Sequence, residues 1–68
     1  MNTAKYIAKN VKRLRNERKI TLQELAAATN ISEHYLQRIE NEDAKGLKLY
    51  HIEVFCKAFG VEPRDILN

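Results

Sequence analysis

The chain has 68 residues, of which 44% are hydrophobic and 31% are charged, and its formal net charge is +3. A chain of this length can bury only one small core, so we expect residues 1–68 to form a single domain. Residues 1–20 carry seven basic residues and one acidic residue, whereas the rest of the chain carries five basic and eight acidic residues. The positive charge is therefore concentrated in the N-terminal segment.

Several classes of protein are disfavoured by the same composition. The N-terminal segment has no continuous apolar run of the kind that a signal peptide or a membrane span needs, so we expect a cytoplasmic protein with no membrane partner. Cys56 is the only cysteine, which leaves no partner for an intrachain disulfide. A lone thiol in an apolar periodic segment is typical of a small core residue.

The first predicted element is an amphipathic helix over residues 3–18. Ile7, Val11 and Leu14 recur at steps of four and three residues, which places them on one face of a helix. The basic residues fall mostly on the other face. We therefore expect this helix to contribute its apolar face to the core.

The second predicted helix has a complete set of start signals. Thr21 can cap it and Glu24 can close a capping box. Ile20 and Leu25 have the spacing of a hydrophobic staple. The helix should end near Asn30, because Asn is one of the few residues that tolerate a left-handed backbone.

A third helix is predicted after a tight turn. Ser32 can cap its start, and Ile31 and Leu36 again have the spacing of a staple. Leu36 and Ile39 supply its inward face, and the helix should end around Asn41. Two short helices joined by a turn of about three or four residues are the components of a helix-turn-helix motif.

Two further helices complete the predicted all-α fold, which contains no strand pattern. Residues 42–48 are polar and indicate a loop. The apolar face of a fourth helix is then marked by residues at helical spacing, Leu49, Ile52, Cys56 and Phe59. Gly60 should end that helix, and Pro63 occupies the first position of a short fifth helix, where its missing N–H costs nothing.

No catalytic or metal-binding constellation is apparent. His34 and His51 are far apart in the sequence, and no Gly-rich phosphate loop occurs. His51 and Cys56 lie on different faces of the predicted fourth helix and have no further ligand at a useful spacing. We therefore interpret His51 as a surface residue and Cys56 as a core residue, and we expect neither a cofactor nor a metal.

The sequence resembles the lambda-repressor-like Cro/CI-type helix-turn-helix family over nearly its whole length. The segments that carry the resemblance are Leu14-Arg15, Thr21 to Ala26, Asn30-Ile31-Ser32, Leu36 to Glu40, Ile52, Cys56 to Val61 and Asp65-Ile66-Leu67. The resemblance implies a compact five-helix domain with the helix-turn-helix at its second and third helices. It also implies an ion pair between Arg15, late in the first helix, and Glu40, late in the third helix, that orients both helices.

The resemblance also assigns residues that would contact double-stranded DNA. The base-reading positions are Ser32, Glu33, His34, Gln37 and Arg38, of which Arg38 is the strongest candidate because its guanidinium can bind guanine O6 and N7. The backbone-contacting positions are Thr21, Gln23, Tyr35, Asn41, Lys45 and Lys48. The alternative for each of these residues is an ordinary solvated helix face or loop.

The sequence departs from the family pattern at two places. Leu22 occupies a position where the family often carries a phosphate-binding Gln, so that Gln23 or the backbone must compensate. Glu40, Glu42 and Asp43 lie beside the expected binding surface. If Arg15 neutralises Glu40, two acidic charges still repel phosphates, which would weaken non-specific binding more than specific binding.

The function that these observations favour is sequence-specific DNA binding by a transcriptional regulator, a repressor or autoregulator that binds a near-palindromic operator as a homodimer. The expected dimer surface comprises Val61, Pro63, Ile66 and Leu67, because Ile66 and Leu67 cannot both face a five-helix core. The alternative is an antitoxin or another protein-interaction module with the same fold. An enzyme is disfavoured, because no reactive constellation is found.

Overall fold

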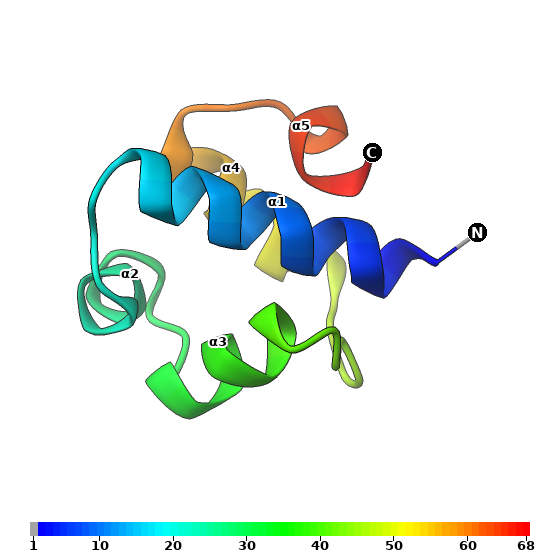
Figure 1. The fold of residues 1–68 in the computed structure, drawn as a ribbon, viewed down its shortest axis with the longest axis horizontal. Coiled ribbons are helices and arrows are strands. Elements are labelled where there is room, and N and C mark those ends of the chain that lie inside the picture. The colour runs from blue at the N-terminus through cyan, green and yellow to red at the C-terminus, as the bar shows by residue number, and fades with distance from the viewer. Residues whose placement is uncertain (1) are drawn as a thin grey trace.

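A computed structural model describes residues 2–68, and all regular structure in this part of the chain is α-helical (Figure 1). The helices in chain order are α1 (Thr3–Glu17), α2 (Leu22–Thr29), α3 (Glu33–Glu40), α4 (Leu49–Phe59) and α5 (Pro63–Leu67). The predicted all-α fold with five helices is thus confirmed, and the helix-turn-helix is formed by α2 and α3. Helix α1 ends one residue earlier than predicted, because Arg18 forms its C-terminal cap.

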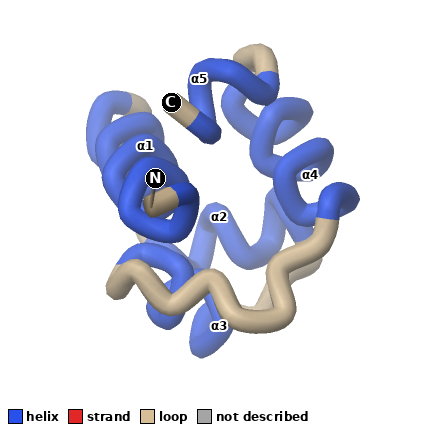
Figure 2. Tube along the Cα trace, turned by 90° about the vertical axis from the view of Figure 1, so that its right-hand side faces the viewer, coloured by secondary structure: helices blue, strands red, loops and turns tan. Residues whose placement is uncertain are grey.

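Helix α1 is the centre of the arrangement. It packs against α3, α4 and α5, while α2 packs against α3 and α4. Figure 1 shows α5 on one side of α1 and α3 on the opposite side. The loop of residues 41–48 leaves α3 and crosses to α4 on the side of the molecule that carries α3 (Figure 2). Helix α3 and this loop therefore share one surface.

The core is formed by apolar residues from all five helices. The large side chains that are completely enclosed are Val11, Leu25, Leu36, Ile39, Phe55 and Ile66. Each side chain of this kind contributes about 1.5–3 kcal/mol by leaving water. The inward faces predicted for α1 and α3 are confirmed, since Ile7 and Leu14 are also buried.

The predicted start and stop signals of the helix-turn-helix are present. Thr21 Oγ1 accepts from the Glu24 N–H at 3.0 Å, and the Thr21 N–H donates to Glu24 Oε1 at 2.8 Å. Asn30 ends α2 with φ at 60°, in the left-handed region. Ser32 Oγ then accepts from the Tyr35 N–H at 3.1 Å and caps α3. These bonds satisfy backbone donors that a helix start leaves unpaired.

The inward face of α4 differs from the predicted one. Leu49 was expected in the core but is 73% exposed, whereas Phe55 is fully buried. At 3.6 residues per turn, the face centred on Ile52, Phe55 and Phe59 leaves Leu49 about 87° from its centre and His51 about 73° away. Cys56 lies at the edge of this face and is half-buried rather than enclosed.

His51 is buried and not a surface residue as predicted. Only 7% of it is exposed, and its Nδ1 accepts from the Lys48 N–H at 2.9 Å. Its ring stacks on Tyr50 at a centroid distance of 4.1 Å and lies 5.5 Å from the ring of Tyr35. The imidazole thus holds the start of α4 against the helix-turn-helix, a structural role that helical periodicity did not reveal.

Two side chains, one within α1 and one at its C-terminal cap, form hydrogen bonds to the ends of other helices. The buried Asn10 donates from Nδ2 to the carbonyl oxygens of Ile66 at 2.8 Å and Asn68 at 2.9 Å. Arg18 donates to the carbonyl oxygen of Phe59 at 2.7 Å, at the end of α4. Both contacts satisfy carbonyl groups that have no partner within their own helix.

Candidate nucleic-acid interface

The outward face of α3 is polar and accessible. Leu36, Ile39 and Glu40 are buried on the inward face. His34 and Arg38 lie one turn apart on the opposite side of the helix, as their spacing of four residues requires. His34 is exposed and Arg38 is half-buried.

The remaining base-reading candidates share the same surface. Ser32, Glu33 and Gln37 are exposed, with Ser32 and Glu33 at the start of α3 and Gln37 beside Arg38. The structure therefore brings all five predicted base-reading residues to one accessible end and face of α3. Their contacts with DNA stay a prediction.

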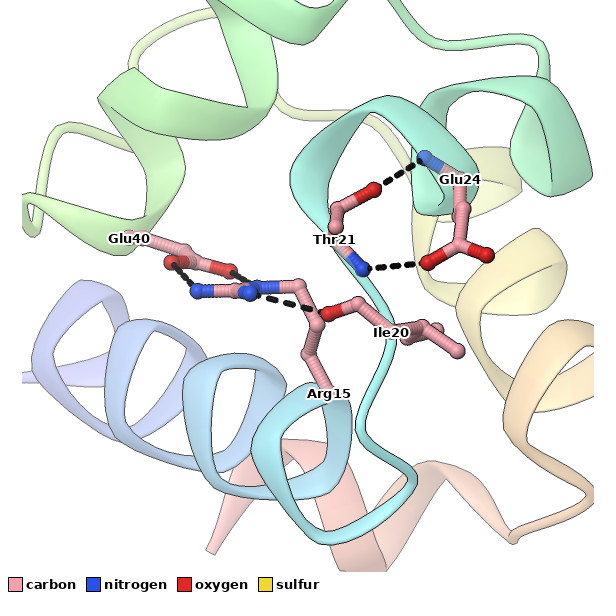
Figure 3. Close-up of polar contacts among 5 residues, drawn as sticks. All are labelled: Arg15, Ile20, Thr21, Glu24 and Glu40. Atoms are coloured by element: carbon pink, nitrogen blue, oxygen red, sulfur yellow. Dashed lines mark hydrogen bonds and ion pairs between the residues drawn. The ribbon is translucent and has the colours of Figure 1, made fainter.

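Arg15 and Glu40 form a bidentate ion pair between α1 and α3 (Figure 3). Arg15 Nε donates to Glu40 Oε2 at 2.8 Å, and Arg15 Nη2 donates to Glu40 Oε1 at 3.1 Å. Arg15 Nη1 also donates to the carbonyl oxygen of Ile20 at 3.0 Å, just before α2. The hydrogen bond with Glu40 raises the pKa of Arg15 above its ordinary value, so this guanidinium stays charged.

This ion pair fixes the relative orientation of three elements. The Glu40 side chain is 5% exposed and the Arg15 side chain 17%, so solvent screens the pair weakly. Two parallel charge-assisted hydrogen bonds impose a defined geometry on both side chains. Because the third bond reaches Ile20, the pair links α1, the segment before α2 and the end of α3.

Arg38 is held at the surface by a residue of the following loop. Its Nε donates to Asp43 Oδ2 at 3.0 Å, and its Cζ lies 5.5 Å from the centre of the Tyr35 ring. The Arg38 and Asp43 side chains are 39% and 47% exposed. The hydrogen bond from Arg38, followed by one from the Lys45 N–H, lowers the pKa of Asp43 below its ordinary value.

The loop of residues 41–48 is bonded to α3 at several points. The Asp43 N–H donates to the carbonyl oxygen of Arg38 at 2.9 Å. The Tyr35 hydroxyl donates to the carbonyl oxygen of Lys45 at 3.0 Å, so its proton is already engaged within the protein. Glu42 adopts a φ of 67° where the chain turns out of α3.

The backbone-contacting candidates flank α3. Thr21 and Gln23 are exposed at the start of α2, and Asn41, Lys45 and Lys48 are exposed in or beside the loop. Figure 1 shows α2 on one side of α3 and the loop on the other. Helix N-termini and lysines on either side of an inserted helix are suited to phosphate groups on both edges of a groove.

The acidic residues beside this surface differ in their partners. Glu40 is paired with Arg15, as anticipated, but Asp43 is also paired, with Arg38. Within residues 2–68, Glu42 is the one member of this acidic trio that forms no ion pair. The repulsion of phosphates stays a prediction, in which Glu42 is the carboxylate that has no ion pair within the described residues.

The predicted dimer surface on α5 needs one correction. Ile66 has no exposed area, because it faces the core where α5 packs against α1 and α4. Its side chain is thus unavailable to a second subunit. Pro63 is exposed, and Val61 and Leu67 are half-buried, so these three apolar residues remain accessible.

The described residues provide neither a metal-binding cluster nor a membrane-spanning helix. In residues 2–68, no group of three or more His, Cys, Asp and Glu side chains is placed to hold a metal ion. None of the helices in this range combines the length and the apolar composition that crossing a membrane requires.

Comparison with known proteins identifies the family. A family model described as a Cro/C1-type HTH DNA-binding domain matches residues 10–68, which includes most of α1 and all of α2 to α5. Comparisons with curated proteins and with solved structures gave no match. The chain therefore belongs to the Cro/C1-type helix-turn-helix DNA-binding family.

Proposed function

We propose that residues 1–68 act as one domain that binds double-stranded DNA sequence-specifically and represses transcription. Helix α3 enters the major groove, which is wide enough to admit an α-helix. The observation that carries the proposal is the accessible polar face of α3, held in a defined orientation by the buried Arg15–Glu40 pair. A rigidly oriented helix can present its side chains to base edges without a large entropic cost.

Base recognition is assigned to the side chains at the start and on the outer face of α3. Arg38 binds guanine O6 and N7, while His34 and Gln37 hydrogen-bond a purine edge. Glu33 accepts from the N4 amino group of cytosine, since a carboxylate can only accept. Ser32 retains a hydroxyl proton for donation, because its Oγ acts as an acceptor in the helix cap.

Phosphate contacts position the domain on the duplex. Lys45 and Lys48 bind one strand from the loop, and Asn41 hydrogen-bonds the same strand at the end of α3. Thr21 and Gln23 bind the other strand together with the N-terminal backbone of α2. Tyr35 contributes by holding the loop in place through Lys45.

A dimer is proposed because one domain of this size reads too few base pairs for strong specificity. Two copies would bind a near-palindromic operator with half-sites about 34 Å apart, one turn of the duplex. Val61, Pro63 and Leu67 are the proposed contact residues, with Ile66 excluded by its burial. Occupancy of an operator that overlaps a promoter is sufficient for repression.

The proposal is tested by measuring fluorescence anisotropy on two labelled duplexes. The first is the best sequence selected from a randomised duplex library by the protein, and the second is a random duplex of equal length. We expect at least about a 1000-fold preference for the selected duplex, a steep negative dependence of affinity on salt, and two protein chains per site. Failure to enrich any sequence, with weak and equal binding to both duplexes, would contradict the proposal and favour the protein-interaction alternative.

A further inference from the structure

The carboxylate of Asp43 lies against the Nε edge of the Arg38 guanidinium. Arg38 Nε donates to Asp43 Oδ2 at 3.0 Å. Within residues 2–68, neither Nη group of Arg38 donates to another residue. A guanidinium carries five N–H donors in a rigid planar fork, so the pair with Asp43 uses one donor and leaves the two Nη groups for a ligand.

Tyr35 limits the movement of the same guanidinium from a second direction. Its ring centre lies 5.5 Å from Arg38 Cζ, within the range of a cation–π contact. Arg38 is therefore held by a carboxylate at its Nε edge and by an aromatic ring beneath it. Such restraint removes side-chain rotamers that a free arginine would populate, a loss that is otherwise incurred on binding.

Asp43 is itself fixed before any ligand binds. Its backbone N–H donates to the carbonyl oxygen of Arg38 at 2.9 Å, and its Oδ1 accepts from the Lys45 N–H at 3.2 Å. The carbonyl of Lys45 in turn accepts from the Tyr35 hydroxyl. The loop therefore presents the second oxygen, Oδ2, to Arg38 from a backbone that is bonded to α3.

From this geometry we infer that Asp43 is a specificity-determining positioning residue, which holds Arg38 with both Nη groups directed at guanine O6 and N7. The inference rests on the proposed function. A restrained Arg38 turns less readily toward a phosphate, where its charge would be attracted regardless of sequence. Asp43 thus increases discrimination between base pairs while lowering affinity for random DNA.

The test compares two variants that each remove one acidic charge from the same loop. Asp43→Asn keeps an Oδ1 acceptor for the Lys45 N–H but loses the charged partner of Arg38. Glu42→Gln is the matched control, because Glu42 forms no ion pair within the described residues. Both variants are measured by anisotropy on the selected duplex and on duplexes in which each G·C pair is replaced in turn. The Arg38→Ala variant identifies the base pair that Arg38 reads, since discrimination disappears there.

We expect Asp43→Asn to lose about tenfold discrimination at that base pair and to keep discrimination elsewhere, as befits a bidentate contact. Glu42→Gln should bind every duplex somewhat more tightly and keep its discrimination. In the Arg38→Ala background, Asp43→Asn should have no further effect on discrimination. A merely structural role of Asp43 would change affinity for all duplexes alike.

Two outcomes would overturn the inference, and they are distinguishable. Unchanged discrimination in Asp43→Asn at the base pair read by Arg38, with the wild-type preference intact, would refute the role of Asp43 and leave the proposed function standing. Failure of the wild-type protein to select any sequence would refute the proposed function and this inference together. Thermal unfolding of Asp43→Asn shows whether the variant is folded. Loss of the partly exposed pair should lower its free energy of unfolding by under about 1 kcal/mol.

Discussion

Replacing Arg15 with Met removes the cation from the least exposed ion pair in the described chain. The Glu40 carboxylate, with its side chain 5% exposed, then loses two charge-assisted hydrogen bonds, and the Ile20 carbonyl loses one. Breaking a buried pair by removing one partner costs about 3–5 kcal/mol, because a buried charge remains without compensation. A 68-residue domain has a total stability of about 3–10 kcal/mol, so a large share of it would be lost.

The assay is urea unfolding followed by circular dichroism, with a matched control on the same helix. Arg13→Met removes a cation whose pair with Glu17 has side chains 45% and 56% exposed, so it should cost under about 1 kcal/mol. The double variant Arg15→Met with Glu40→Leu should recover most of the loss, since no buried charge remains. Equal destabilisation by Arg13→Met and Arg15→Met, each under about 1 kcal/mol, would refute the role assigned to burial.

Three further predictions follow from contacts elsewhere in the fold. Asn10→Ala should lower the free energy of unfolding by about 1–3 kcal/mol, because the buried carbonyl of Ile66 loses its donor; urea unfolding measures this, and no loss would contradict it. Thr21→Ala should lower the free energy of unfolding by about 0.5–2 kcal/mol, because the Glu24 N–H loses its cap; thermal unfolding measures this, and an unchanged midpoint would contradict it. Burial raises the pKa of the Cys56 thiol above its ordinary value, and nearby carboxylates add to the effect. Iodoacetamide at pH 8 should therefore alkylate the folded protein more slowly than the urea-unfolded chain, and equal rates would contradict this prediction.

The helix-turn-helix could be predicted from the sequence because its signals are local. The capping box of Thr21 and Glu24 needs only residues three apart, and the left-handed Asn30 needs only its own side chain. The inward face of α3 follows from helical spacing alone, as the burial of Leu36 and Ile39 illustrates. Local rules of this kind place α3 without knowledge of its neighbours.

The errors concern residues whose surroundings come from distant parts of the chain. The inward face of α4 is decided by where α2 and α5 pack against it. Helical spacing alone did not fix this face, so the prediction included Leu49, which is exposed, and missed His51, which is buried. Ile66 was assigned to a dimer surface because its burial depends on contacts with α1, more than 50 positions away, where Asn10 bonds to its carbonyl. No short-range pattern carries that information.

The candidate site shows a similar division between local and tertiary information. The exposed positions of α3 follow from its periodicity, and the pair of Arg15 with Glu40 was expected from the family resemblance. The pair of Arg38 with Asp43 was missed, because Asp43 follows the end of α3 and its direction depends on the turn at Glu42. A positive φ at a non-glycine residue is uncommon and is not readily predicted at a glutamate.

The Arg15–Glu40 and Arg38–Asp43 pairs differ in burial, and this difference separates their roles. The enclosed pair of Arg15 with Glu40 joins two helices, so its loss should reduce stability. The exposed pair of Arg38 with Asp43 lies at the end of α3, where solvent screens it and its contribution to stability is small. The restraint of Arg38 that we propose would change a measured quantity only when a ligand contacts the two Nη groups. An unfolding experiment should therefore detect the first pair and nearly miss the second, whereas base discrimination in a fully folded variant should depend on the second.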